Sequence, residues 1–269
     1  MNRIDQKFRL LRQKKEKALI VFVTAGDPDL RKTERLIAAF ERDGVDLLEL
    51  GVPFSDPLAD GPVIQASSQR ALKKNVTLKK ILQLVERARR TTQIPIILMS
   101  YLNPVMQYGY QKFTQDAKKA GVDGMIFPDL PVEEGEEIAP FMQKSGLSLI
   151  YLLAPTSTPL RKKKVASRSR GFIYYVSMTG VTGMRNKLPT EILSDISRIR
   201  RQTKTPLCAG FGISTPEQAR VMAGSADGVI VGSAVVRFIH EHARESAEQI
   251  SKKCVRPFAA ALGKKCPKP

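Results

Sequence analysis

Short apolar runs alternate with longer amphipathic segments along almost the whole chain. The apolar runs, which we expect to be strands, lie at residues 19–24, 45–50, 94–100, 122–127, 147–152, 172–177, 206–209 and 227–231. The segments between them favour helices over residues 31–43, 78–91, 109–120, 133–146, 159–168, 189–203, 215–223 and from 233 onward. This strict alternation of strands and helices predicts a parallel sheet.

Eight strand and helix units in a chain of 269 residues match a closed barrel better than an open doubly wound sheet. An open nucleotide-binding sheet usually has a GxGxxG turn after its first strand, and the turn here, TAGDP at 24–28, lacks it. An amphipathic helix is also predicted over residues 1–17, with Ile4, Phe8, Leu10 and Leu11 as its apolar stripe. We therefore predict one α/β domain over residues 1–269, a (β/α)8 TIM barrel with an extra N-terminal helix.

Composition narrows the class of protein. Hydrophobic residues make up 42% of the chain and charged residues 26%, as is typical of a globular protein. No apolar run is long enough to cross a bilayer, and residues 1–17 lack the apolar core of a secretory signal, so we expect a cytoplasmic protein without a membrane partner. The three cysteines form no CxxC pair, so we expect neither a disulfide framework nor a metal site.

The formal net charge of +18 raises the question whether the chain binds nucleic acid or another anionic partner. The basic residues form scattered runs, at 12–17, 161–164, 198–204 and 252–265, without interleaved aromatic residues. We expect most of them to be solvated helix faces, with attraction of an anionic substrate or an acidic partner as the alternative. No nucleic-acid partner is predicted, and the sequence offers no physical account of the excess charge.

One carboxylate interrupts the second predicted strand. Side chains alternate along a strand, so Leu47, Glu49 and Gly51 face one way while Leu48 and Leu50 face the other. Burying a lone carboxylate costs several kcal/mol, so Glu49 must form an ion pair, hold a proton or have a catalytic role. The strand alone leaves two interpretations open, a structural ion pair and a catalytic group.

Three connections, after strands two, three and six, exceed the usual length of loops between a strand and the next helix. All three lie at the carboxyl ends of their strands, where barrels hold their active sites. The loop after strand two carries the carboxylates of Asp56 and Asp60. The loop at 178–185, MTGVTGMR, has two glycines that can act as hinges, so it is a candidate lid, and a mobile surface loop is the alternative.

Glycine-rich turns follow strands seven and eight, AGFGIS at 209–214 and VGSA at 231–234, and each leads into a helix. Glycine lets the backbone approach a ligand closely, and free amides at the start of a helix attract an anion. Barrels commonly bind phosphate between these two loops, so the pair predicts a small phosphate ester as substrate. Tight-turn geometry explains either turn alone.

Proton transfer in such a site would fall to carboxylates and tyrosine. The only two histidines, His240 and His242, lie on the last helix, and no cysteine at a strand end has a histidine partner. Glu49 is held by a strand and Asp60 by a loop, so different environments could push their pKa values apart, as an acid and base pair requires. Eleven residues separate the two, so only the folding of the loop can bring them together.

The chain resembles the tryptophan synthase alpha chain family over almost its whole length. The most specific match is LELGVPFSDPLADGP at 48–62, and further matches are FVTAGDP at 22–28, YLNP at 101–104, DLP at 129–131, GVTG at 180–183 and GFGIS at 210–214. The resemblance implies a carbon–carbon lyase of tryptophan biosynthesis that cleaves indole-3-glycerol phosphate to indole and glyceraldehyde 3-phosphate. It also implies that indole passes to a beta chain in an alpha2-beta2 heterotetramer, with pyridoxal phosphate in the beta chain and no cofactor in this chain.

The resemblance also implies roles for single residues. Glu49 resembles the proton donor to the indole ring, which then serves the side-chain hydroxyl in a retro-aldol step, and Asp60 resembles the partner of the ring N–H. Asp56 would face the beta chain. Substrate-binding positions are implied at Phe22, Met99, Tyr101, Ile126, Leu152, Tyr174, Thr182, Gly183, Phe211, Gly212, Gly232 and Ser233, of which Gly183, Gly212, Gly232 and Ser233 would hold the phosphate.

One position departs from the family pattern. Met178 stands where the family often has arginine, beside the predicted lid. This departure bears on the ordering of the lid and on communication with the beta chain. The alternative function is a catalytically weak alpha-type subunit that acts mainly as an activator of a beta chain. Another phosphate-handling barrel, such as an indole-glycerol-phosphate synthase or a sugar isomerase, comes third, because such lyases use a lysine on strand one where this chain has Thr24.

Overall fold

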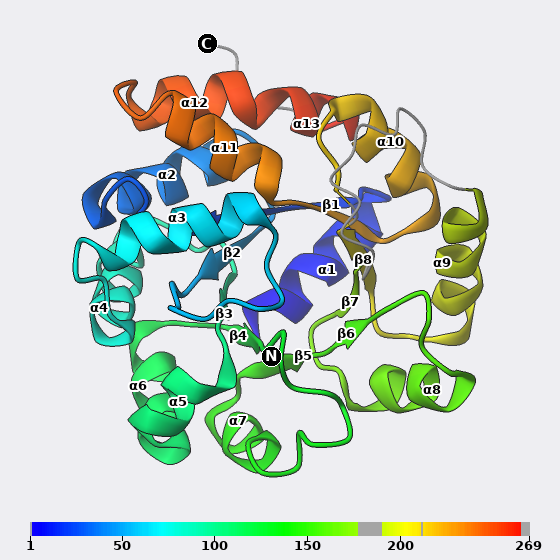
Figure 1. Ribbon diagram of the computed structural model, residues 1–269. Helices are drawn as coiled ribbons and strands as arrows, with labels where there is room; N and C mark the ends of the chain where they lie inside the picture. Colours follow the sequence, from blue (N-terminus) through cyan, green and yellow to red (C-terminus); the bar gives the residue numbers. More distant parts are fainter. Residues whose placement is uncertain (1, 177–189, 211, 265–269) are drawn as a thin grey trace.

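The computed structural model describes residues 2–176, 190–210 and 212–264, and within them nine strands form one parallel sheet. The strands are β1 (Ala18–Thr24), β2 (Leu47–Gly51), β3 (Ile96–Met99), β4 (Gly124–Ile126), β5 (Ser148–Ile150), β6 (Leu152–Leu153), β7 (Ile173–Val176), β8 (Leu207–Gly210) and β9 (Gly228–Val231). Their order in the sheet is β5-β4-β3-β2-β1-β9-β8-β7-β6. β5 and β6, at the two ends of this order, are separated only by Tyr151, so they are halves of the fifth predicted strand and complete the barrel (Figure 1). The predicted TIM barrel is confirmed.

The strands are buried on both faces, as their continuous apolar runs require. On β2, Leu48 and Leu50 belong to the cluster between the strands and the outer helices, whereas Leu47 belongs to the cluster inside the barrel. The strand residues of the inner cluster are Ala18, Ile20, Leu47, Ile97, Ile126, Ile150, Cys208 and Ile230, and Phe172, directly before β7, joins them. The alternation predicted for β2 is therefore confirmed, and it directs Glu49 to the inside of the barrel.

Helices surround the barrel in chain order (Figure 1). They are α2 (Leu30–Arg42), α3 (Pro62–Leu72), α4 (Leu78–Ala88), α5 (Leu102–Tyr108), α6 (Tyr110–Ala120), α7 (Ala139–Ser145), α8 (Pro159–Arg168), α9 (Thr190–Gln202), α10 (Pro216–Ser225), α11 (Ser233–Glu241), α12 (Ala247–Cys254) and α13 (Arg256–Ala261). The predicted helices are found, most of them within a few residues of the expected bounds.

The helix prediction is wrong in three places: it missed two helices, and it began a third one too early. The long connections after β2 and β3 each contain a helix, α3 and α5, whose apolar patterns are weak and whose first turns contain proline, which the start of a helix tolerates. The helix predicted from residue 133 begins only at Ala139, because residues 132–138 form turns. Gly135 in these turns lies so close to Tyr151 that an added Cβ would come within 1.8 Å of the tyrosine hydroxyl.

The extra N-terminal helix, α1 (Arg3–Lys14), closes the end of the barrel at which the strands begin. Ile4, Phe8 and Leu11 pack into the inner cluster, and the Phe8 ring lies 5.9 Å from the ring of Phe172. The prediction that Leu10 shares this stripe is wrong, because Leu10 is 44% exposed. Residue 10 points to the side, because residues three and four apart, not adjacent ones, share a helix face.

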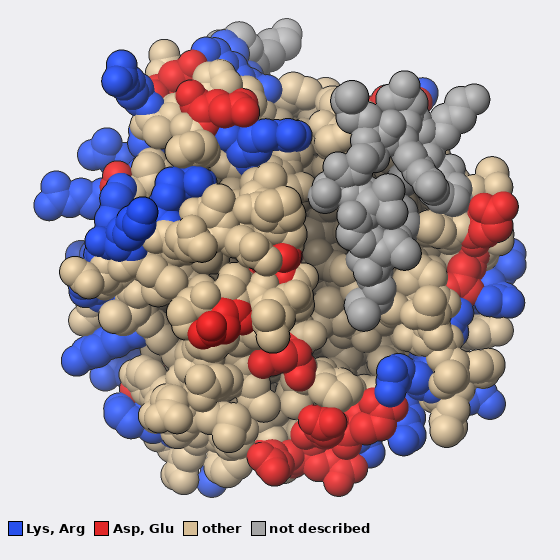
Figure 2. All heavy atoms as spheres, viewed as in Figure 1, with Lys and Arg blue, Asp and Glu red and all other residues tan. Residues whose placement is uncertain are grey.

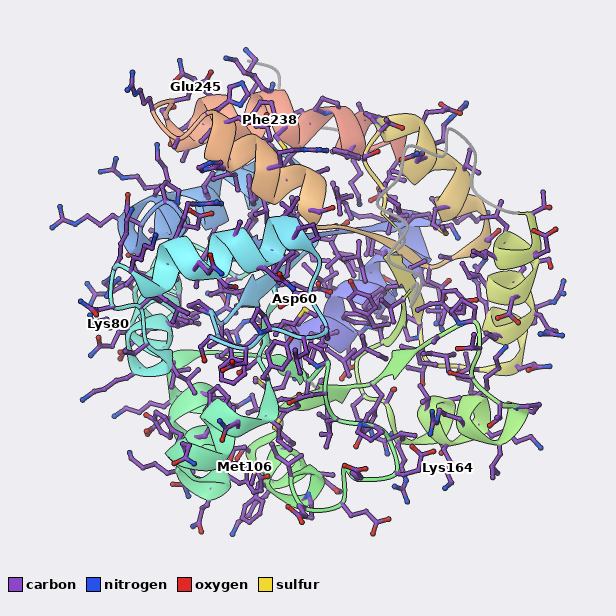
Figure 3. All side chains as sticks on the ribbon, in the orientation of Figure 1. Asp60, Lys80, Met106, Lys164, Phe238 and Glu245 are labelled. Atoms are coloured by element: carbon purple, nitrogen blue, oxygen red, sulfur yellow. The ribbon has the colours of Figure 1, made fainter. Side chains whose placement is uncertain are left out.

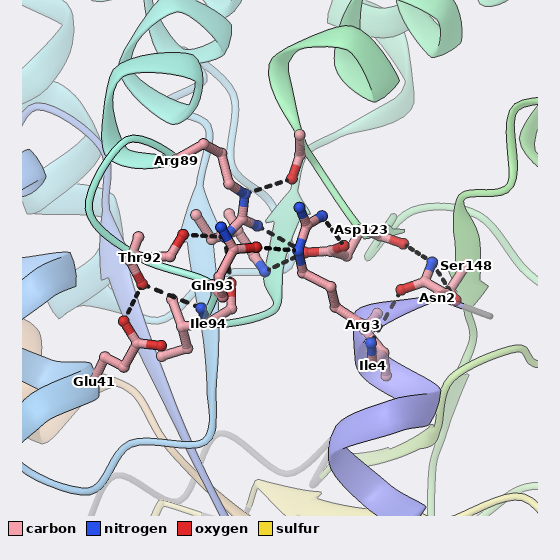
Figure 4. A network of polar contacts seen from close by, with 12 residues as sticks. Asn2, Arg3, Ile4, Glu41, Arg89, Thr92, Gln93, Ile94, Asp123 and Ser148 are labelled. Atoms are coloured by element: carbon pink, nitrogen blue, oxygen red, sulfur yellow. Dashed lines mark hydrogen bonds and ion pairs between the residues drawn. The ribbon is translucent and has the colours of Figure 1, made fainter.

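Asp123, directly before β4, ties α1 to the barrel (Figure 4). Its carboxylate accepts hydrogen bonds from Arg3 at 3.0 Å, from Arg89 at 2.7 Å and from the Ile96 N–H at 2.9 Å. Its backbone carbonyl accepts a further one from the side chain of Asn2 at 2.6 Å. With three donors on one buried carboxylate, this network holds the closed end of the barrel rigid and leaves the other end for the site.

Lys and Arg lie mainly at the periphery of the face seen in Figure 2, over the outer helices, as expected for solvated surfaces. Acidic side chains lie nearer the centre of this face and along its lower edge. None of the helices in the described ranges is both long and apolar enough to cross a membrane.

Candidate active site

Glu49 lies in the middle of β2, and its side chain is completely buried. Its neighbours in the sheet register are Phe22 on β1 and Ile97 on β3. Within the described part of the chain, neither oxygen of the Glu49 carboxyl has a hydrogen-bond partner. Burial raises the pKa of Glu49 to about 8, so the group holds a proton at neutral pH. The described residues therefore form no ion pair of the kind that the sequence left open.

Tyr174 on β7 lies within electrostatic reach of both predicted carboxylates. Burial raises its pKa most, and the negative charges of Glu49 and Asp60 raise it further. Its hydroxyl lies against Gly210 at the end of β8, where an added Cβ would come within 2.7 Å of the hydroxyl oxygen. The missing side chain at Gly210 therefore makes room for the tyrosine.

Asp60 lies on the loop between β2 and α3, and Figure 3 shows it at the centre of the ring of elements. Its Oδ2 lies 3.3 Å from the Tyr101 hydroxyl, which also accepts a hydrogen bond from the Ala59 N–H at 2.9 Å. Burial raises the pKa of Asp60 to about 6, and the hydrogen bond from Tyr101 opposes this rise. Asp60 is therefore ionised at neutral pH while Glu49 is protonated, so one group can donate a proton and the other can stabilise positive charge.

A cavity joins the ends of β1, β2 and β3 to the loop of Asp60. Its lining residues are Phe22, Gly51, Val52, Asp60, Ile64, Ser68, Met99, Ser100, Tyr101 and Pro128. Four of the positions singled out in the sequence, Phe22, Met99, Tyr101 and Asp60, thus meet at one cavity. Gly51 is necessary for this shape, because an added Cβ there would lie 2.5 Å from the Phe22 ring.

Sequence reasoning missed several residues of this cavity. Ile64 and Ser68 lie on α3, the helix that was not predicted, so nothing in the pattern assigned them to the site. Ser100 directly follows β3 and Pro128 lies two residues after β4, and their position at carboxyl ends of strands could have identified them.

The remaining predicted positions divide into two groups. Ile126 is fully buried in the inner cluster, and the half-buried side chains of Leu152 and Tyr174 pack against that cluster. Phe211, Met178, Thr182, Gly183 and the predicted lid at 178–185 lie outside the described residues.

The predicted phosphate turns border the same end of the barrel. Gly232 is the N-cap of α11 and Ser233 its first residue, and the first turn of this helix has no acidic residue. An added Cβ at Gly232 would lie 3.6 Å from Cβ of Phe22, so this turn adjoins the wall of the cavity. Gly212 has a φ of 58°, a left-handed conformation that glycine adopts without strain. Backbone amides at these turns can hold an anion.

Asp56 lies on the same loop as Asp60 but is exposed, and Leu58, two residues further along, is 94% exposed.

The described residues contain no group of three His, Cys, Asp or Glu side chains that could hold a metal ion. The two carboxyl groups at this end of the barrel differ in protonation state: Asp60 lines the cavity and is ionised at neutral pH, whereas Glu49 is protonated and lies on β2, between the strands that carry Phe22 and Met99.

Comparison with known proteins gives one consistent result. A family model described as tryptophan synthase alpha chain matches residues 8–262. The tryptophan synthase alpha chain of Geotalea daltonii is 55% identical over 237 residues, which cover 88% of this chain and 90% of the relative. That of Pelobacter propionicus is 46% identical over 267 residues, which cover 99% of this chain and 98% of the relative.

Solved structures agree with these relatives. Tryptophan synthase subunit alpha from Legionella pneumophila superposes with a TM-score of 0.91 at 40% sequence identity, covering 98% of this chain and 99% of that one. A chain of the tryptophan synthase complex from Pyrococcus furiosus superposes with a TM-score of 0.83 at 35% identity, covering 91% of this chain and 99% of that one.

Proposed function

The chain belongs to the tryptophan synthase alpha chain family, whose members cleave indole-3-glycerol phosphate to indole and glyceraldehyde 3-phosphate, and we propose that Glu49 and Asp60 carry out its proton chemistry. The chain is a carbon–carbon lyase of tryptophan biosynthesis. The observation that supports the residue assignment is the buried carboxyl group of Glu49, which has no hydrogen-bond partner among the described residues and lies on a strand whose neighbouring strands line a cavity together with Asp60.

The first step of the proposed mechanism is protonation of the indole ring. Glu49, protonated because burial raises its pKa to about 8, donates its proton to C3 of the ring. The ring then carries positive charge at its nitrogen. The carboxylate of Asp60, ionised above about pH 6, accepts a hydrogen bond from the ring N–H and stabilises that charge.

The second step breaks the carbon–carbon bond. Glu49, now ionised, removes the proton from the hydroxyl group on the side-chain carbon attached to C3. A carbonyl forms at that carbon, the bond to C3 breaks, and its electron pair returns to the ring and restores indole. Glu49 is protonated again, so the cycle balances without a cofactor in this chain.

Apolar and backbone groups complete the proposed site. Phe22 and Met99 would contact the indole ring from the cavity side, with Ile126 and Leu152 deeper in the barrel. Phe211 is proposed as a further contact from the sequence alone. The amides of Gly212, Gly232 and Ser233, with Gly183 and Thr182 of the predicted lid, would hold the phosphate group. The helix start at Ser233 supports this assignment because its first turn has no acidic residue to repel an anion.

An alpha chain of this family has a beta chain as partner. We propose in addition an alpha2-beta2 heterotetramer in which only the beta chain binds pyridoxal phosphate and Asp56 faces that partner. Asp56 and Leu58 of this loop are both exposed, so their side chains are accessible to a partner chain. A single domain over residues 1–269 and a cytoplasmic location remain predictions from the sequence.

The test measures indole release by the isolated chain and by its mixture with a beta chain. Glu49→Gln and Asp60→Asn should each slow release by about two to four powers of ten. Glu86→Gln, which removes an exposed carboxylate on α4, is the matched control and should leave the rate unchanged. Undiminished rates in both site variants would overturn the assignment. An inactive isolated chain that only raises beta-chain activity would instead support the catalytically weak activator.

A further inference from the structure

Tyr101 has an unusual position for a residue at the mouth of a barrel. It is the N-cap of α5, lies two residues after the end of β3, and is only 7% exposed. Its ring stacks on Phe54 of the loop after β2, with ring centroids 5.1 Å apart and ring planes 27° apart. Its hydroxyl contacts the next part of the same loop, at Ala59 and Asp60. One side chain from the connection between β3 and α5 thus contacts two points of the loop that follows β2.

The hydrogen-bonding capacity of a phenol decides the direction of both contacts. The Ala59 N–H can only donate, so the Tyr101 oxygen accepts from it at 2.9 Å. The single hydroxyl proton of Tyr101 then remains for Asp60 Oδ2 at 3.3 Å. Burial and the charge of Asp60 raise the pKa of Tyr101, so the hydroxyl keeps this proton throughout the working pH range.

Few other described contacts hold this part of the loop. The Leu58 and Asp60 N–H groups donate to Asp56 and Pro57 within the loop itself. The Asp60 carbonyl accepts from the Gln65 side chain on the adjoining helix α3. Among the described residues, Tyr101 is therefore the only one outside this loop and helix that hydrogen-bonds to residues 58–60.

We propose that Tyr101 is a positioning residue, whose hydroxyl holds Asp60 Oδ2 and the Ala59 amide so that Asp60 Oδ1 is presented to the ring N–H of the substrate. The inference rests on the proposed function of Asp60 and deepens it. From the family resemblance we expected Tyr101 to bind the substrate. Because its hydroxyl already donates to Asp60 and accepts from Ala59, we propose instead that it acts on the substrate through Asp60. It also keeps Asp60 ionised, since donation to a carboxylate favours its charged form.

The test is the pH dependence of kcat/KM for indole release, which reports groups of the free enzyme. The wild-type chain should lose activity as the pH falls through about 6, where Asp60 takes up a proton. Tyr101→Phe keeps the ring and its stacking but removes the donor, so this acid limb should move to higher pH by about one unit. Below the limb the variant should therefore be about tenfold slower than wild type, with a smaller deficit at pH 8.

Phe54→Leu is the control for a role in packing alone, because it removes the stacked ring and leaves the Tyr101 hydroxyl in place. It should lower activity without moving the acid limb. In an Asp60→Asn background, Tyr101→Phe should add little further loss, since its effect passes through Asp60. A Tyr101→Phe profile with an unmoved limb, or full additivity with Asp60→Asn, overturns this inference. An Asp60→Asn chain as active as wild type overturns the proposed function itself.

Discussion

Replacing the buried acid Glu49 by glutamine should stabilise the folded protein while it slows indole release, and the gain in stability should grow with pH. Glu49 has an ordinary pKa of 4.5 when exposed and a pKa of about 8 in the folded chain, with burial as the cause. Between these two pH values the folded state holds a proton that the unfolded state has lost. Because the folded state binds more protons, the free energy of unfolding falls as the pH rises.

The size of the effect follows from the two pKa values. They differ by about 3.5, and at about 1.36 kcal/mol per pH unit the wild-type chain loses on the order of 5 kcal/mol between pH 4.5 and 8. Glutamine has nearly the same shape and no charge, so the variant avoids this loss. We expect the two proteins to be similar in stability near pH 4.5 and to differ most above pH 8.

Urea unfolding followed by circular dichroism at pH 5, 7 and 8.5 measures this difference directly. Glu86→Gln removes a solvent-exposed carboxylate and should track the wild-type chain at every pH. A difference between wild type and Glu49→Gln that stays constant with pH would refute the reasoning. A wild-type chain that gains stability relative to the variant as the pH rises would show that Glu49 is ion-paired.

Three further predictions concern the frame around the site. Ile4→Ala should cost about 2–5 kcal/mol of unfolding free energy because Ile4 fills the inner cluster. Leu10→Lys, on the exposed side of the same helix, should change the free energy of unfolding by no more than about 0.5 kcal/mol. Equal losses for Ile4→Ala and Leu10→Lys in urea unfolding would contradict the observed orientation of α1. Asp123→Ala should cost about 3–5 kcal/mol, since it leaves buried donors unpaired, and an unchanged urea midpoint would argue against the network. Gly51→Ala should push the Phe22 ring into the cavity, cost about 1–3 kcal/mol, and lower kcat/KM for indole release; normal kinetics would mean that Phe22 can move aside.

The hydrophobic pattern of the sequence was enough to predict most of the fold. Runs that are apolar at every position must be buried on both sides, and eight of them alternating with helices leave few arrangements other than a closed parallel barrel. The hydrophobic pattern did not predict local irregularities in the strands and helices. Examples are the break of the fifth strand at Tyr151 and the late start of α7, whose preceding turns bring Gly135 against Tyr151, 16 positions away in the chain. Helices α3 and α5 were missed because their short sequences lack a clear apolar stripe.

By itself, the sequence determined that Glu49 lies on a buried strand facing away from Leu48 and Leu50, and that both histidines, His240 and His242, follow the last predicted strand. Those statements depend on residue identity and on the alternation of a strand, which are local properties. Only the tertiary structure decided that the described residues leave Glu49 without a hydrogen-bond partner, that the loop brings Asp60 to the cavity at the ends of β1, β2 and β3, and that Tyr101 contacts Asp60 there. The physical reason is that distances between distant residues depend on how loops close across the barrel, and no local pattern encodes that closure.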